Sequence, residues 1–112
     1  MRTTVVELAA FIRAAKDVMT EAEREALVTY LSEFPDAGVS LGGGLWKLRF
    51  ARTGSGKRGG FRVIHYYLPG RGLPVFLMTV FAKTAKADLT PNEQAGLTEI
   101  GARIATGYGG RQ

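Results

Sequence analysis

The chain has 112 residues, 46% hydrophobic and 22% charged, with a formal net charge of +5, which is the composition of one globular domain with a modest core. It has no cysteine and a single histidine, His65, so we expect no disulfide, no metal site and no cofactor. The sequence contains no apolar run of membrane-spanning length, and residues 1–4 lack signal-peptide features, so we expect a cytoplasmic location.

The first third of the chain predicts a strand followed by two helices. Residues 3–6 are all β-branched, which favours a short strand. Apolar residues then recur at helical spacing from Leu8 to Met19, which predicts an amphipathic helix. Thr20-Glu21-Ala22-Glu23 is a capping-box sequence, so we expect it to open a second helix that Pro35 ends.

The middle of the chain predicts three consecutive antiparallel strands. Leu45–Phe50 alternates apolar and basic residues, as a strand with one buried face does. Residues 61–68 form a second expected strand, and Pro-Gly-Arg-Gly at 69–72 predicts a tight turn. Residues 75–81 are nearly all apolar, which is typical of a buried central strand.

A closing helix is predicted from Thr90-Pro91-Asn92-Glu93, which joins a capping box to a proline at the first helical position. We expect one domain over residues 1–106 and a flexible tail over residues 107–112. The element order β-α-α-β-β-β-α belongs to the α+β class, with the helices packed on one face of an antiparallel sheet.

Positive charge is concentrated in the centre of the chain. Between Asp36 and Asp88 there are nine basic residues and no carboxylate, whereas the segments on either side are mildly acidic. A field of one sign repels itself, and a polyanion such as nucleic acid compensates that cost through counterion release. If the predicted strands are neighbours, the basic side chains converge on one face or rim of the sheet. The alternative is a basic surface that serves only solubility.

Strand alternation divides the remaining candidates between two faces. Tyr66 shares a face with Arg62, which makes it a candidate for base stacking or proton transfer. His65 lies on the opposite face, which favours a structural role over that of a general base, and Trp46 fits the core better than a stacking platform. The Gly56-Lys57 pair does not make a phosphate-binding P-loop, because Arg58 and then a strand follow it.

Three segments together resemble the RelE/HigB-type toxins of bacterial toxin–antitoxin modules, within the RelE/ParE superfamily. They are Gly-Leu-Trp-Lys-Leu-Arg-Phe at 44–50, Gly-Lys-Arg-Gly-Gly-Phe-Arg-Val-Ile-His-Tyr-Tyr at 56–67, and Val-Phe-Ala-Lys-Thr-Ala-Lys-Ala-Asp-Leu-Thr at 80–90. The resemblance implies a compact α+β endoribonuclease that needs no metal. Such an mRNA interferase cuts mRNA, commonly in the ribosomal A site, and so inhibits translation.

The same resemblance implies roles for individual residues. Arg62 would stabilise the reacting phosphate with support from Arg49 and Lys57, and Lys83 would hold RNA or assist proton transfer. Further RNA-binding candidates are Lys47, Arg52, Arg58, Tyr66 and Lys86. The chain departs from many relatives, which carry arginine in place of Trp46 and an aromatic residue in place of His65. The proton donor and acceptor stay open: Thr90 falls close to the place where relatives carry such groups, and Tyr108 and Arg111 in the tail could substitute.

The resemblance also implies partners: a cognate antitoxin of the helix-turn-helix HigA type, mRNA, the 70S ribosome, and operator DNA only through the antitoxin. No membrane partner is expected. Two alternatives from other classes remain: a ParE-like inhibitor that binds gyrase, and an RNA-binding module without catalysis.

Overall fold

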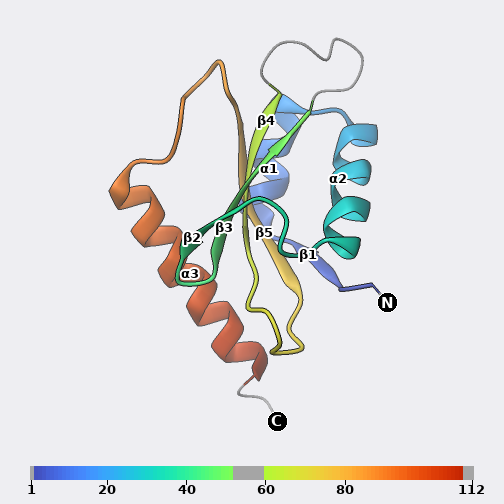
Figure 1. The fold of residues 1–112 in the computed structure, drawn as a ribbon. Helices are drawn as coiled ribbons and strands as arrows, with labels where there is room; N and C mark the ends of the chain where they lie inside the picture. Colours follow the sequence, from blue (N-terminus) through green and yellow to red (C-terminus); the bar gives the residue numbers. More distant parts are fainter. Residues whose placement is uncertain (1, 52–59, 110–112) are drawn as a thin grey trace.

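The structure is a computed structural model that describes residues 2–51 and 60–109 (Figure 1). Its elements, in chain order, are β1 (Val5–Glu7), α1 (Ala9–Val18), α2 (Glu21–Glu33), β2 (Val39–Gly42), β3 (Leu45–Phe50), β4 (Phe61–Tyr66), β5 (Val75–Ala82) and α3 (Pro91–Gly109). The α+β class and the order of the expected elements are confirmed. None of the described helices is both long and apolar enough to span a membrane.

The five strands form one mixed sheet in the order β1-β5-β4-β3-β2. β3, β4 and β5 are antiparallel neighbours, as expected, but β1 runs parallel to β5, with Val5 paired to Val75. The expectation of a purely antiparallel sheet was therefore wrong. β1 and β5 are joined through most of the chain, so their relative direction follows from the path of the intervening helices and not from a local turn.

β2 is an additional edge strand that the sequence pattern did not predict. It pairs with β3 through a register shift between Ser40 and Gly42. Gly42, Gly43 and Gly44 all have positive φ and make the turn into β3. Three of the four β2 residues are exposed, so the strand has no alternating apolar pattern by which it could have been recognised.

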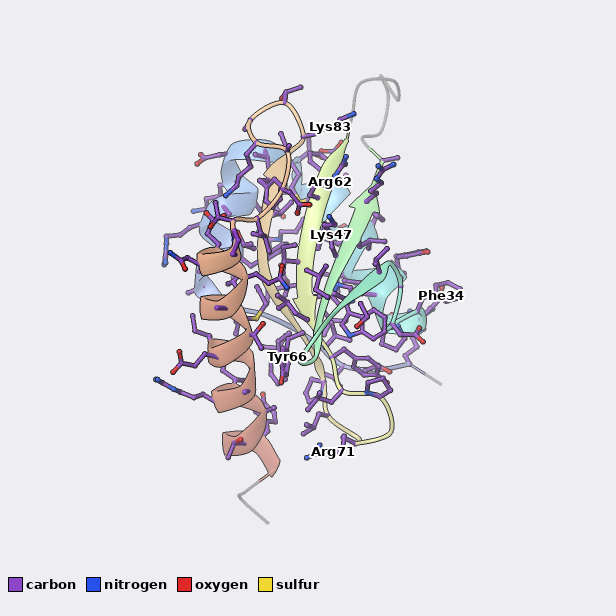
Figure 2. The ribbon with its side chains drawn as sticks, turned by 60° about the vertical axis from the view of Figure 1, so that its left-hand side comes forward. Phe34, Lys47, Arg62, Tyr66, Arg71 and Lys83 are labelled. Carbon is purple, nitrogen blue, oxygen red and sulfur yellow. The ribbon has the colours of Figure 1, made fainter. Side chains whose placement is uncertain are left out.

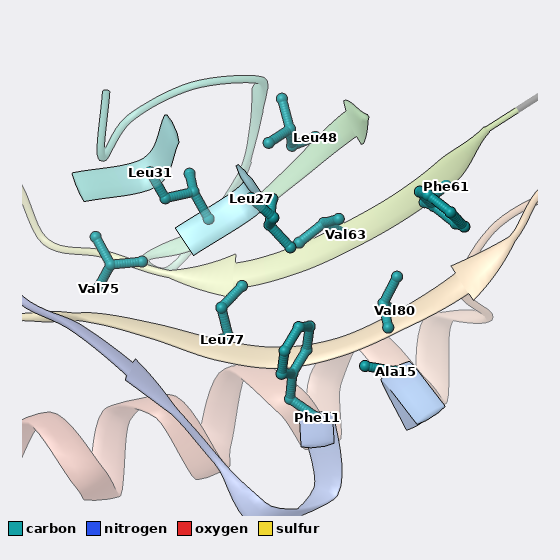
Figure 3. Close-up of a cluster of buried hydrophobic side chains, with 10 residues drawn as sticks. All are labelled: Phe11, Ala15, Leu27, Leu31, Leu48, Phe61, Val63, Val75, Leu77 and Val80. Carbon is teal, nitrogen blue, oxygen red and sulfur yellow. The ribbon is translucent and has the colours of Figure 1, made fainter. Parts of the chain in front are cut away.

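One face of the sheet packs against α1 and α2 (Figure 3). Phe11 and Ala15 from α1, and Leu27 and Leu31 from α2, are buried there. The strand residues of this cluster are Leu48, Phe61, Val63, Val75, Leu77 and Val80. The β4 members, Phe61 and Val63, occupy alternate positions, as strand periodicity predicts. On β5 the alternation is interrupted between Leu77 and Val80, where the register with β4 shifts.

The opposite face packs against α3, which corrects the expectation that all helices share one face (Figure 1). Ala105 of α3 is buried with Ile64, Tyr66, Phe76 and other residues of the alternate strand positions. Amphipathic periodicity shows that a helix must be covered but not which sheet face covers it, so the sequence left this open. α3 continues to Gly109, past the boundary expected at residue 106.

Candidate nucleic-acid interface

Three basic side chains of β3 and β4 lie on the sheet face that α3 partly covers. The register pairs Arg49 directly with Arg62 and Lys47 with Ile64, a residue of the α3-side core. Figure 2 shows Arg62 and Lys47 near Lys83 toward one end of the molecule, with Arg71 at the other end. Arg62 is only 7% exposed, whereas Arg49 is exposed, so Arg62 is held by packing while Arg49 is accessible.

The Arg49–Arg62 pairing is unusual for a sheet. Like charges placed directly opposite each other on antiparallel strands destabilise the pairing. A bound anion between or above two guanidinium groups removes this repulsion and uses their planar donor geometry. The strand register therefore places two guanidinium-bearing residues opposite each other on one face of the sheet.

The segment that follows β5 adds two lysines to the same end. Lys83 is exposed, and its backbone N–H donates to Gly60 O at 3.4 Å, next to the start of β4. Lys86 has its Nζ 5.3 Å from the ring centroid of Phe81, whose partner in the sheet is Arg62. We define the cationic face as Lys47, Arg49, Arg62, Lys83 and Lys86.

Two carboxylates from the segment before α3 and its first turn are bound to this cationic face. Asp88 Oδ2 lies 2.7 Å from Lys47 Nζ, and Glu93 lies 2.6–2.8 Å from Lys86 Nζ through its two oxygens. The hydrogen bond from Lys47, then the N–H of Leu89, and at longer range the charge of Arg62 lower the pKa of Asp88. Lys86, followed by the N–H of Thr90, lowers the pKa of Glu93. Both groups are therefore ionised at neutral pH.

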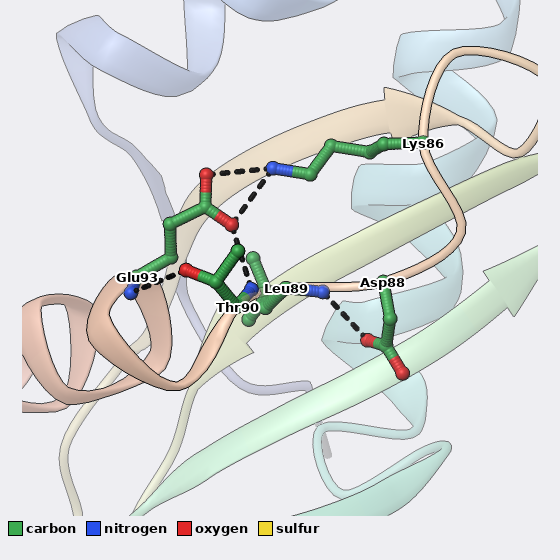
Figure 4. Close-up of polar contacts among 5 residues, drawn as sticks. All are labelled: Lys86, Asp88, Leu89, Thr90 and Glu93. Carbon is green, nitrogen blue, oxygen red and sulfur yellow. Dashed lines mark hydrogen bonds and ion pairs between the residues drawn. The ribbon is translucent and has the colours of Figure 1, made fainter.

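Glu93 also has a structural role at the start of α3 (Figure 4). Its Oε1 accepts from the N–H of Thr90, and the hydroxyl of Thr90 accepts from the N–H of Glu93. This reciprocal capping box confirms the helix start predicted from the sequence. Asp88 stands outside that box, with Oδ1 accepting from the N–H of Leu89 at 2.8 Å.

Comparison with protein-family models matches residues 3–108 to the RelE toxin of the RelE/RelB toxin–antitoxin system. The chain belongs to the RelE toxin family. It is therefore a toxin of a toxin–antitoxin module, and an antitoxin is its implied partner.

In this RelE-family toxin, some of the residues that the sequence suggested for RNA binding or proton transfer lie away from the cationic face. Tyr66 is 3% exposed, and its ring lies against Gly44 and Gly101, where an added Cβ would be 2.6 and 2.3 Å from it. The ring thus has no free face for stacking on a base. Tyr108 is 47% exposed and lies edge-on to Phe76 of the α3-side core, with 5.2 Å between the ring centroids. The candidates Arg52, Lys57, Arg58 and Arg111 lie outside the described residues.

His65 of the toxin is completely buried on the face opposite Arg62, as its strand position predicted. Its Nε2 is 3.1 Å from Pro35 O, and because a carbonyl can only accept, Nε2 carries the proton. The ring stacks on Trp46, which in turn donates Nε1–H to Tyr67 O at 3.0 Å. Burial lowers the pKa of His65 to about 4, so the ring is neutral and has a packing role.

The described part of the toxin contains no group of three or more histidine, cysteine, aspartate or glutamate side chains arranged to hold a metal ion. The contacts that sequence reasoning missed are the two lysine–carboxylate pairs. Lys47 and Asp88 are 41 residues apart, and only the position of the segment before α3 beside β3 brings them together. The acid-free centre of the sequence therefore does not correspond to an acid-free surface.

Proposed function

We propose that this RelE-family toxin is a metal-independent endoribonuclease that cleaves mRNA in the ribosomal A site and so inhibits translation. The observation that carries the proposal is the direct pairing of Arg49 with Arg62 inside the cationic face. Guanidinium groups bind phosphate oxygens through a planar fork of donors, and the phosphodiester backbone of RNA supplies phosphates in series.

The proposed reaction needs little more than these groups. The 2′-hydroxyl of a nucleotide attacks the adjacent phosphorus, which gives a cyclic phosphate and a free 5′-hydroxyl. Charge develops on the non-bridging oxygens, where Arg62 and Arg49 would stabilise it with fixed donors. Lys47, Lys83 and Lys86 would contact neighbouring phosphates. On the strength of the resemblance alone, Lys57 remains a proposed support for phosphate stabilisation, and Arg52 and Arg58 remain proposed RNA contacts.

The proposed partners rest on the basic surface and on the resemblance to HigB-type toxins. A toxin whose functional face is basic can be silenced by a segment of opposite charge or by a protein that blocks entry to the ribosome. We propose a helix-turn-helix antitoxin of the HigA type, through which alone the complex would contact operator DNA. The location of the translating ribosome makes the cytoplasm the proposed compartment.

The test is primer extension on mRNA from translating ribosomes after expression of the wild-type toxin and three variants. Arg62→Ala is expected to abolish cuts within codons, and Arg62→Lys to leave a weak residual activity, because lysine keeps the charge but not the two-pronged donor geometry. Arg71→Ala, at the opposite end of the molecule, is the matched control and should cut like wild type. Thermal melts check that all variants are folded.

Other outcomes would support the alternatives. Growth arrest with intact mRNA and with DNA breaks would replace the proposal with a ParE-like gyrase inhibitor. Salt-sensitive RNA binding without cleavage on ribosomes would leave an RNA-binding module. Unchanged cutting by Arg62→Ala would remove the central residue of the proposed mechanism.

A further inference from the structure

We propose that Asp88 is the proton acceptor of the cleavage reaction, taking the proton from the attacking 2′-hydroxyl. The inference rests on the proposed ribonuclease function and fills the role that the sequence left open. Its basis is the position of the Asp88 carboxylate, one of the two bound to the cationic face, at 2.7 Å from Lys47 Nζ.

The strand register fixes where this carboxylate lies. Lys47 and Arg49 are two residues apart on β3 and point to the same face, and Arg62 is directly opposite Arg49. Lys47 is therefore the diagonal neighbour of Arg62, a separation of about 7–8 Å between backbones that long side chains span easily. Asp88 is held at Lys47 and also feels the charge of Arg62. A phosphate on the two arginines would thus have this carboxylate beside it.

The orientation of Asp88 is fixed while lone pairs remain free. Oδ2 binds Lys47 Nζ, and Oδ1 binds the N–H of Leu89 at 2.8 Å. Each carboxylate oxygen has two lone-pair directions, so each keeps one for a substrate hydroxyl. The side chain is 53% exposed, so a substrate can reach it.

Three other titratable groups, His65, Tyr66 and Glu93, suit this role less well. His65 is fully buried on the wrong face, and Tyr66 is 3% exposed beneath Gly44 and Gly101. Glu93 is bound through both oxygens to Lys86 and also caps α3, so moving it would open the first turn of that helix. Asp88 has no capping role and contacts the β3 lysine closest to Arg62.

The step balances as a transesterification. The 2′-oxygen forms a bond to phosphorus as its proton passes to a carboxylate oxygen of Asp88, and the bond from phosphorus to the 5′-oxygen breaks. The leaving 5′-oxygen takes a proton from water. Asp88 then returns its proton to solvent, which leaves the enzyme unchanged. General-base catalysis of this kind typically contributes 10²–10⁴-fold to the rate.

The experiment compares Asp88→Asn with Glu93→Gln in single-turnover cleavage of ribosome-bound mRNA. Each variant removes one carboxylate from one lysine pair and keeps an oxygen that can accept the same backbone N–H, so each should fold. Asp88→Asn should slow cleavage about 100-fold or more, whereas Glu93→Gln should stay within about threefold of wild type. Asp88→Glu, which retains a displaced carboxylate, should recover part of the rate.

Binding is measured separately with an RNA oligonucleotide whose 2′-hydroxyl is replaced by hydrogen at the cut site. The Asp88→Asn variant should bind it as tightly as wild type or more tightly, because Lys47 loses a competing anion. Cleavage by Asp88→Asn at or above the wild-type rate would overturn the proposal and make Asp88 a simple competitor for Lys47. If wild-type toxin makes no cuts at all, the ribonuclease function itself fails, which is a distinct result.

Discussion

At the scale of single residues, His65 illustrates how burial decides the role of a titratable side chain. It is three residues from Arg62 in sequence and lies on the other face of β4, stacked on Trp46. Loss of solvation lowers its pKa from 6.5 to about 4, while the hydrogen bond to Pro35 O and the charge of Asp36 act in the opposite direction. The imidazole is therefore neutral in the folded protein at pH 7.

This pKa makes the stability of the toxin dependent on pH. In the unfolded chain His65 takes up a proton below pH 6.5, whereas the folded protein resists protonation down to about pH 4. The unfolded state binds more protons in this window, so the free energy of unfolding should fall by roughly 3 kcal/mol as the pH falls from 6.5 to 4. Urea denaturation across that range measures the fall. His65→Gln, which cannot titrate, should show a clearly smaller dependence, and equal curves would contradict this account.

At the scale of elements, the docking of α3 determines what remains open on the cationic face. Gly101 lies close to β4, since a Cβ there would be 2.3 Å from Cδ1 of Tyr66. The tyrosine ring thus occupies the space beside a helical glycine. This contact accounts both for the burial of Tyr66 and for the position of α3 against β4.

The contact can be tested with two glycines of the same helix. Gly101→Ala should lower the free energy of unfolding by about 1–3 kcal/mol, because the added methyl group displaces a packed ring. Gly96→Ala meets no atom within 4 Å, so it should instead stabilise the helix by up to about 1 kcal/mol. The two variants make the same chemical change, and chemical denaturation compares them directly. Similar effects at both positions would show that α3 does not dock as described.

At the scale of the whole molecule, what the sequence predicts is what depends on near neighbours along the chain. Alternation placed Arg62 and His65 on opposite faces, and the capping box of Thr90 located the start of α3. The sheet face on which α3 packs and the Lys47–Asp88 pair depend on contacts between distant segments, so no local sequence pattern predicts them. The sequence therefore predicted the basic residues of the candidate site but not the Asp88 carboxylate that lies among them.

The arrangement of charge over the molecule leads to a last prediction, about salt. Each phosphate contact made by a lysine or arginine releases counterions, so the slope of log K against log salt concentration for single-stranded RNA should lose about 0.7 per contact removed. Lys83 is exposed on the cationic face and has no ion-pair partner among the described residues, so Lys83→Ala should reduce the slope by that amount. Fluorescence anisotropy with a short RNA over a potassium chloride series measures it.

Arg71→Ala is the matched control for this measurement, because it removes the same unit of charge from the opposite end of the molecule. If net charge alone attracts RNA, both variants will change the slope equally, and the cationic face will not be a specific RNA-binding site. If RNA binds where Arg49 and Arg62 are paired, only Lys83→Ala will change the slope. The number of counterions released depends on the phosphates that the protein contacts and not on distant charges. The comparison thus separates a localised binding face from a basic protein that merely attracts polyanions.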